Sequence, residues 1–225
     1  MIKMTRRATA GALAALPLAR PGIIRAQTVS APVKIGLLSD VGGPYRDVGG
    51  PGSKAAAELT VEDFGGSLLG RPLQVLQADD QNKADVASAL AREWLDDRGV
   101  DVLADGGGSS AGLAIQQITR ERKRIYLMST PTSTALIGKQ CSPYGFQFAC
   151  DTYALAKGIG GELAKAGGDT WFFITADYEF GYSLQSNTEE FVKQAGGRVL
   201  GSARAPLGRL TSRNTSSRLR RRAPR

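Results

Sequence analysis

Two stretches rich in serine and threonine are the parts of this sequence whose residue types could bind a small molecule. Three glycines at 106–108 lead into Ser109 and Ser110, where a segment of helical periodicity begins. Hydroxyls and free N–H groups at the beginning of a helix favour a carboxylate, and so does the helix dipole. Ser109 could also simply cap that helix, and the two roles are compatible.

The second stretch, residues 129–134, has the sequence Ser-Thr-Pro-Thr-Ser-Thr and includes Pro131, Thr132 and Ser133. The carbonyl oxygens of such a loop can accept hydrogen bonds from an ammonium group, while its N–H groups and hydroxyls can bind a carboxylate. An ordinary Ser/Thr turn has the same composition. The loop alone is therefore weak evidence for a site.

Aromatic side chains follow two of the predicted strands. Tyr178 and Phe180 lie within residues 177–182, and Tyr45 follows a Gly-Pro turn. Aromatic side chains at the mouth of a cleft cover the apolar part of a small ligand. Packing between the loop and the next helix would account for Tyr178 and Phe180 equally well.

Several kinds of catalytic site are excluded by composition. The sequence has no histidine and only two cysteines, so it cannot form a Ser-His-Asp triad, a His-ligated metal site or a four-cysteine zinc site. The G-x-G-x-x-A string at 106–111 follows the third predicted strand, whereas a dinucleotide fingerprint belongs at the first. Asp79, Asp80 and Asp85 form no evident catalytic pair, and we expect them to be solvated. We therefore expect no enzymatic activity, no cofactor and no metal.

The net charge of +8 comes from the two ends of the chain. Residues 1–26 carry five basic residues and residues 209–225 carry seven arginines, and neither segment contains an acid. The residues between them have a small excess of acidic side chains. A nucleic-acid-binding face on the body of the protein is therefore not expected.

Residues 1–26 have the composition of a secretory signal peptide. Lys3, Arg6 and Arg7 precede an apolar run at 8–18, which is too short to span a bilayer. The arginine pair permits twin-arginine export as well as the general secretory route, and a frayed N-terminal helix is the alternative. We expect a periplasmic location. In that oxidising compartment Cys141 and Cys150 could form a disulfide or remain unpaired and partly buried.

Strands and helices alternate through the rest of the chain, which predicts an α/β fold with parallel sheets flanked by helices. A helix is expected at 53–64, with Ala57, Val61 and Phe64 facing the core. The loop at 130–150 interrupts the alternation, so we expect a first lobe at 27–150 and a partial second lobe at 151–208. Further strands are expected at 33–38, 73–78, 100–104, 125–129, 146–149, 170–175 and 198–203, and further helices at 83–97, 110–122, 153–166 and 183–195.

From about residue 33 to residue 207 the sequence resembles the periplasmic solute-binding proteins of ABC transporters, of the branched-chain amino-acid type. The likeness is carried, in order, by KIGLLSDVGGPY, QADDQNKADVASAL, ADGGGSSAGLAIQQ, CSPYGFQF and WFFITADYEFGYSL. It implies a two-lobed type I binding protein that closes on a small ligand and docks on a membrane permease. The implied ligand is a branched-chain amino acid or a related amide or carboxylate. An exported ligand-sensing module without a transport role is the alternative.

The resemblance also assigns roles by position. Ser109 and Ser110 match the turn that binds the ligand carboxylate, and the loop around Thr132 matches the one that holds both the carboxylate and the ammonium. The Thr-Pro-Thr-Ser sequence departs from the small residues usual in amino-acid binders, which leaves the ligand class open. The full set of expected ligand-binding residues is Tyr45, Val48, Ser109, Ser110, Pro131, Thr132, Ser133, Tyr178 and Phe180.

The last segment, residues 209–225, differs sharply from the body. It contains seven arginines, no acid and no aromatic residue. We expect a disordered basic tail on a truncated or frameshifted family member whose second lobe is incomplete. A genuine basic tail is the alternative.

Overall fold

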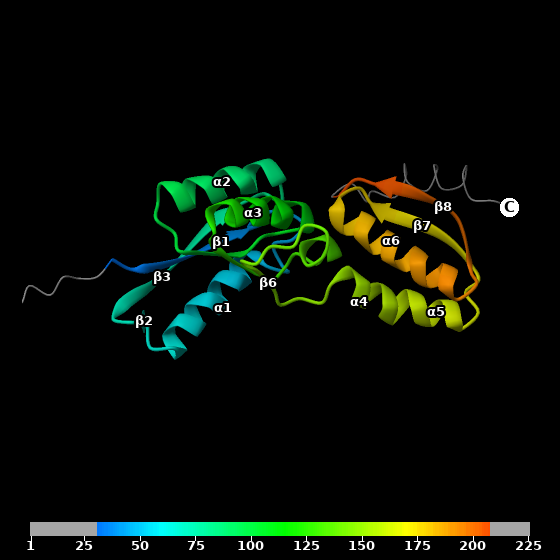
Figure 1. Ribbon diagram of the computed structural model, residues 1–225, viewed down its shortest axis with the longest axis horizontal. Helices are drawn as coiled ribbons and strands as arrows, with labels where there is room; N and C mark the ends of the chain where they lie inside the picture. The colour runs from blue at the N-terminus through cyan, green and yellow to red at the C-terminus, as the bar shows by residue number, and fades with distance from the viewer. Residues whose placement is uncertain (1–30, 208–225) are drawn as a thin grey trace, which may run out of the picture.

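The computed structural model describes residues 31–207, which form two lobes lying end to end along the long axis (Figure 1). The signal peptide expected at 1–26 and the basic tail expected at 209–225 lie outside the described residues. The first lobe is built on a six-stranded sheet of order β2-β3-β1-β4-β5-β6. Its strands are β1 (Val33–Ser39), β2 (Ser67–Leu68), β3 (Arg71–Asp79), β4 (Val102–Asp105), β5 (Ile125–Met128) and β6 (Gly145–Gln147).

Strand β1 lies at the centre of this sheet and pairs in parallel with β3 on one edge and β4 on the other. Its run of apolar residues suits a strand that is covered on both faces. The two-residue strand β2 was not expected from the sequence. It pairs antiparallel with β3 through a tight turn in which Leu69 and Gly70 both have positive φ. All other strand pairs in the sheet are parallel, as the alternation predicts.

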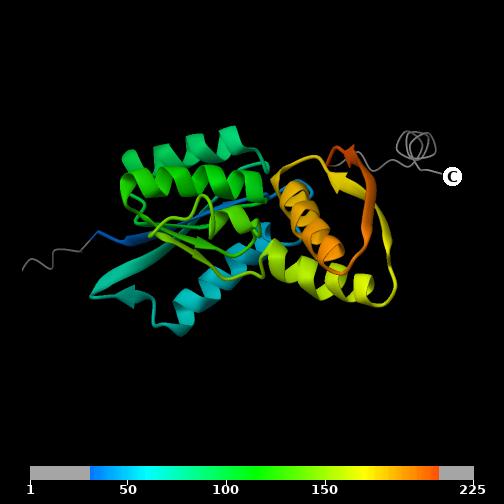
Figure 2. The same cartoon turned by 45° about the vertical axis from the view of Figure 1, so that its right-hand side comes forward.

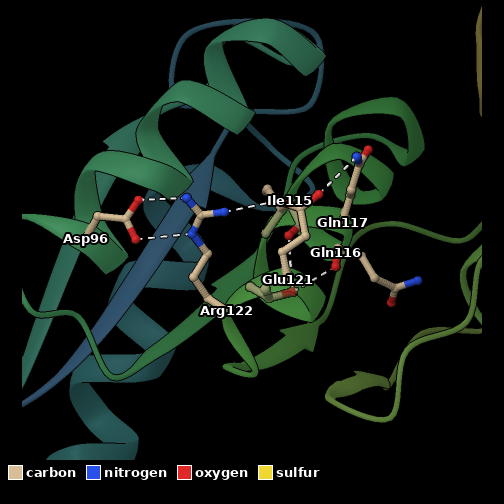
Figure 3. A network of polar contacts seen from close by, with 7 residues as sticks. Asp96, Ile115, Gln116, Gln117, Glu121 and Arg122 are labelled. Carbon is tan, nitrogen blue, oxygen red and sulfur yellow. Dashed lines mark hydrogen bonds and ion pairs between the residues drawn. The ribbon is translucent and has the colours of Figure 1, made fainter.

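Helices α2 (Ala84–Asp96) and α3 (Ser109–Arg122) cover one face of the sheet, and α1 (Gly50–Asp63) crosses the other (Figure 2). The apolar core of the lobe lies under α2 and α3, where Trp94, Leu103 and Ile115 are buried. At the outer surface Arg122 of α3 holds Asp96 of α2 through two hydrogen bonds, of 3.1 and 2.8 Å (Figure 3). The core and this pair fix the two helices against each other.

Helix α1 is more exposed than its apolar residues predict. Ala57 and Val61 are only half-buried, and Phe64, just beyond the last turn, is 63% exposed. The expectation that these residues face a core is therefore wrong for Phe64. Within residues 31–207, α1 lies alone on its face of the sheet, so no neighbouring helix covers its flanks (Figure 1).

The chain enters the second lobe after β6. The helix expected at 153–166 is present, but a π-helical segment, Lys157–Gly161, separates α4 (Thr152–Ala156) from α5 (Glu162–Lys165). Gly160 lies so close to Thr188 that an added Cβ would come within 2.6 Å of its methyl group. A parallel pair of strands, β7 (Thr170–Ala176) and β8 (Arg198–Ala205), completes the lobe together with α6 (Glu179–Gln194).

An apolar groove of about 420 Å³ lies between α4, β7 and α6. Trp171, Phe173 and Leu184 line it, and Ile159 of the π-helical segment lies on its rim, 66% exposed. The second lobe therefore buries much less apolar surface than the first.

Both cysteines are free and exposed. The disulfide alternative for Cys141 and Cys150 is therefore wrong, and so is the expectation that the unpaired cysteines are partly buried.

Candidate functional site

The two hydroxyl-rich stretches of the sequence meet at the beginning of α3. The Oγ atom of Ser109 accepts hydrogen bonds from the backbone N–H groups of Thr132, at 3.3 Å, and Ser133, at 3.1 Å. Ser109 is buried, and Gly108 rather than Ser109 is the N-cap residue. The capping role considered for Ser109 is therefore wrong: its hydroxyl fixes the loop at 131–133 against the end of the helix.

Glu179, the first residue of α6, joins this site from the second lobe. Ser133 donates a hydrogen bond of 2.7 Å from its Oγ to Oε1 of Glu179. The backbone N–H of Glu179 lies 3.4 Å from the Oγ of Ser110, which accepts it. A carboxylate from one lobe thus lies beside two serines of the other. Sequence reasoning missed Glu179, because its partners are 46 and 69 residues away along the chain.

A second group of polar contacts also joins the two lobes. The Oγ atom of Ser183 is 2.6 Å from Oγ1 of Thr152 and 3.0 Å from Oγ1 of Thr134. Asn187 donates to Thr152 at 3.0 Å. These hydroxyls connect the loop at 131–134 to both α4 and α6. Thr134 belongs to the hydroxyl-rich stretch at 129–134, but nothing in the sequence indicated its partners in the second lobe.

The predicted aromatic residues are only partly brought together. Tyr45 and Tyr178 meet across the two lobes, edge to face, with ring centroids 6.3 Å apart. Burial, and then the charge of Asp40, raises the pKa of the Tyr45 phenol. Phe180 lies beside Tyr178 but also lines the apolar groove of the second lobe, and Val48 is 70% exposed. Of the predicted aromatic residues, Tyr45 and Tyr178 are thus the two that meet between the lobes.

Three buried carboxyl groups lie at the carboxyl ends of β1, β3 and β4, beneath the site. Asp40 accepts hydrogen bonds from the N–H groups of Gly43 and Tyr45. Asp105 accepts from Ser39 at 2.6 Å and also from the hydroxyls of Ser129 and Thr130. The third carboxyl group belongs to Asp80, which is fully buried, so the expectation that it is solvated is wrong.

The glycines at 106–108 form the turn from which α3 begins. Gly106 and Gly107 have φ values of 111° and 54°, in the region that favours glycine. The backbone N–H of Gly108 donates to Oδ1 of Asn82 at 2.9 Å. Pro131, on the opposite side, is buried against Gly112 of α3. The turn thus serves to place Ser109 and Ser110 at the site.

Within residues 31–207, no helix is both long and apolar enough to cross a membrane. In the same range, no group of three or more His, Cys, Asp or Glu side chains is placed to hold a metal ion.

The chain belongs to the periplasmic binding protein family, because residues 32–219 match the model of that family. The match runs past residue 208 and so includes part of the segment expected to be a basic tail. No curated protein matches the chain. The mostly parallel sheet flanked by helices is the fold of the type I periplasmic binding proteins.

Solved structures of ABC transporter binding proteins resemble this one. A periplasmic binding protein from Burkholderia mallei is 44% identical, with a TM-score of 0.79 over 85% of this chain and 50% of its own. A branched-chain amino-acid ABC transporter ligand-binding protein from Burkholderia xenovorans is 32% identical, with a TM-score of 0.68 over 84% of this chain and 50% of its own.

A solute-binding protein from Rhodopseudomonas palustris, solved with 3,4-dihydroxybenzoic acid, shares the fold at 22% identity, with a TM-score of 0.72. It covers 84% of this chain and 51% of its own. This chain therefore spans about half the length of the solved structures that it matches.

Proposed function

We propose that this protein is the extracytoplasmic solute-binding receptor of an ABC importer, and that its ligand is an amino acid of the branched-chain type. Residues 27–150 and 151–208 act as its two lobes, and a membrane permease receives the ligand. Family membership and the 32% identity to a branched-chain amino-acid binding protein support this role. The Rhodopseudomonas palustris protein solved with 3,4-dihydroxybenzoic acid shares the fold, which is why aromatic acids are included as competing ligands below.

The observation that carries the proposal is that Glu179 of the second lobe contacts Ser133 and Ser110 at the beginning of α3. The first N–H groups of α3 have no partner within the helix and, with the Ser110 hydroxyl, suit a ligand carboxylate. Glu179, held beside Ser133, can accept a ligand ammonium group. A zwitterionic amino acid satisfies both groups, whereas an aromatic carboxylate would place a second negative charge near Glu179.

The remaining residues of the site cover the ligand side chain. Tyr45 and Tyr178 approach each other from the two lobes and provide an apolar wall. Within residues 31–207 the chain passes between the lobes once, through residues 148–151, so a rotation about this connection opens the site. The ligand then replaces the contact between Ser133 and Glu179 and holds the lobes closed.

Isothermal titration calorimetry on the full chain tests the proposal, with L-leucine, L-isoleucine, L-valine, benzoate and 4-hydroxybenzoate as ligands. We expect the amino acids to bind and the two aromatic acids to bind more weakly. Glu179→Gln should weaken L-leucine binding by about ten- to hundredfold, because a charged hydrogen bond is lost.

Glu190→Gln is the matched control, since Glu190 lies on the same helix and is exposed. It removes the same charge and should leave leucine affinity unchanged. Failure of all five ligands to bind would contradict the receptor role. Benzoate binding more tightly than leucine would contradict the assignment of the ligand class.

A further inference from the structure

Asp80 is a buried carboxyl group with an incomplete set of partners. It follows β3 directly and has 0% of its surface exposed. Its Oδ1 accepts the backbone N–H of Asn82 at 2.8 Å. Its Oδ2 is also buried, and it has no hydrogen-bond partner within residues 31–207. A charge at this position would therefore be poorly compensated.

The carboxyl group of Asp80 packs against the turn that begins α3. A Cβ added to Gly107 would lie 3.0 Å from each carboxyl oxygen of Asp80. The carboxyl group therefore packs directly against the backbone of Gly107. The backbone N–H of Asn82 donates to Asp80, and the side-chain oxygen of Asn82 in turn accepts a hydrogen bond from the N–H of Gly108. Two neighbouring contacts thus connect Asp80 to the turn that places Ser109 and Ser110.

The ionisable groups that act on Asp80 are three carboxylates, and each of them disfavours its charge. They are Asp79 at the end of β3, Asp40 just after β1 and Asp105 at the end of β4, and their negative charges act on Asp80. Tyr126 of β5 is buried behind them and donates to the carbonyl of Asp105. The ammonium group of Lys83 donates to Gln81 at the exposed surface.

The pKa of Asp80 reflects these surroundings. This pKa is raised to about 7: burial is the largest cause, the N–H of Asn82 acts in the opposite direction, and the three neighbouring carboxylates add smaller increases. The group therefore changes its charge near neutral pH.

We propose that Asp80 is a positioning residue of the ligand-binding turn, and that its ionisation weakens ligand binding. This inference rests on the proposed function. In its neutral form Asp80 packs against Gly107 and, with Asn82, holds the turn at 106–108 in the geometry that presents Ser110. The charged form draws water or moves away from the turn, and its negative charge opposes a ligand carboxylate at the beginning of α3.

The affinity of the full chain for L-leucine, measured by calorimetry between pH 5.5 and 8, is the first test. The wild-type protein should lose about tenfold in affinity over this range, although leucine itself stays zwitterionic. Asp80→Asn cannot ionise, so it should keep the wild-type affinity of pH 5.5 throughout. Asp85→Asn, which removes an exposed charge from α2, should keep the wild-type pH profile.

Hydrogen exchange of the Gly108 amide, followed by NMR without ligand, is the second test. Its protection factor should fall with rising pH in the wild type and stay constant in Asp80→Asn. Asn82→Ala should lower the protection at every pH, because the acceptor of this N–H is lost.

The two tests separate the two proposals. If no ligand binds but Gly108 protection follows the charge of Asp80, the proposed function fails and the connection between Asp80 and the turn stands. If Asp80→Asn keeps the wild-type pH dependence of either measurement, the positioning role is overturned.

Discussion

On folding, the carboxyl group of Asp80 loses its contact with water and gains one hydrogen bond. The free-energy cost of burying this group depends on its charge and therefore on pH. Burial, together with the neighbouring carboxylates, raises the pKa of its carboxyl group from 3.8 to about 7. Between these two values the folded state binds a proton that the unfolded state releases, so stability falls as pH rises through this window. Above pH 7 the loss is complete, and below about pH 4 it is absent.

Asp80→Asn should remove this pH dependence, because the amide has the same shape and no charge. At pH 8 its free energy of unfolding should exceed that of the wild type by about 2–4 kcal/mol, and at pH 4 the two should agree. Urea unfolding across this pH range measures the difference. Asp85→Asn, on an exposed position in the first turn of α2, should lower stability by less than about 1 kcal/mol and should keep the fall in stability between pH 4 and pH 7. Parallel pH profiles for wild type and Asp80→Asn would contradict the argument.

At the scale of elements, the helices on the two faces of the first sheet contribute unequally. Ile115 of α3 is fully buried among Leu38, Leu103 and Met128, whereas Leu59 of α1 is 61% exposed. The two side chains have the same number of carbon atoms and lie on helices of equal length. Truncating each of them to alanine therefore compares how much packing contributes to stability at a buried and at an exposed position.

Ile115→Ala should lower the free energy of unfolding by about 2–5 kcal/mol, because it removes buried methyl groups and leaves a cavity. Leu59→Ala, the matched substitution on α1, should change it by less than about 0.5 kcal/mol. Denaturant unfolding of the full chain measures both values. Similar losses for the two variants would show that α1 is covered in solution.

At the scale of the whole molecule, stability should be concentrated in the first lobe. The residues of the large apolar core all lie between Leu38 and Leu136. The second lobe has a two-stranded sheet and an open apolar groove. Regions with few buried apolar contacts open at a lower free energy than the core.

Native-state hydrogen exchange at increasing urea concentration should detect this difference. Amides of β7 and β8 should exchange through an opening of lower free energy than those of β1, β4 and β5. The contacts of Ser133 with Glu179 and of Tyr45 with Tyr178 should be lost in that same opening. Exchange of both lobes at one common free energy would show instead that they unfold as a single unit.

Much of the fold could be read from the sequence, because it depends on neighbours along the chain. Apolar periodicity and glycine or proline turns identified nearly all the strands and helices of residues 31–207 in their order. The alternation of β and α then required parallel pairing and placed the loops after β4 and β5 at one edge of the sheet. Ser109 follows the first of these loops and Thr132 lies in the second, and the two are in contact at 3.3 Å.

Only the tertiary structure decided which partners these residues have. Glu179 meets Ser133 because the second lobe turns the beginning of α6 toward α3, an arrangement that no local pattern encodes. The exposure of Phe64 depends on the layers that surround its helix, and the position of Phe180 depends on the groove beside it. The sequence by itself determined the order and type of the elements, since these follow from local periodicity. The burial of Asp80 and the contact between the lobes were decided by the tertiary structure, because each requires segments distant in sequence to pack together.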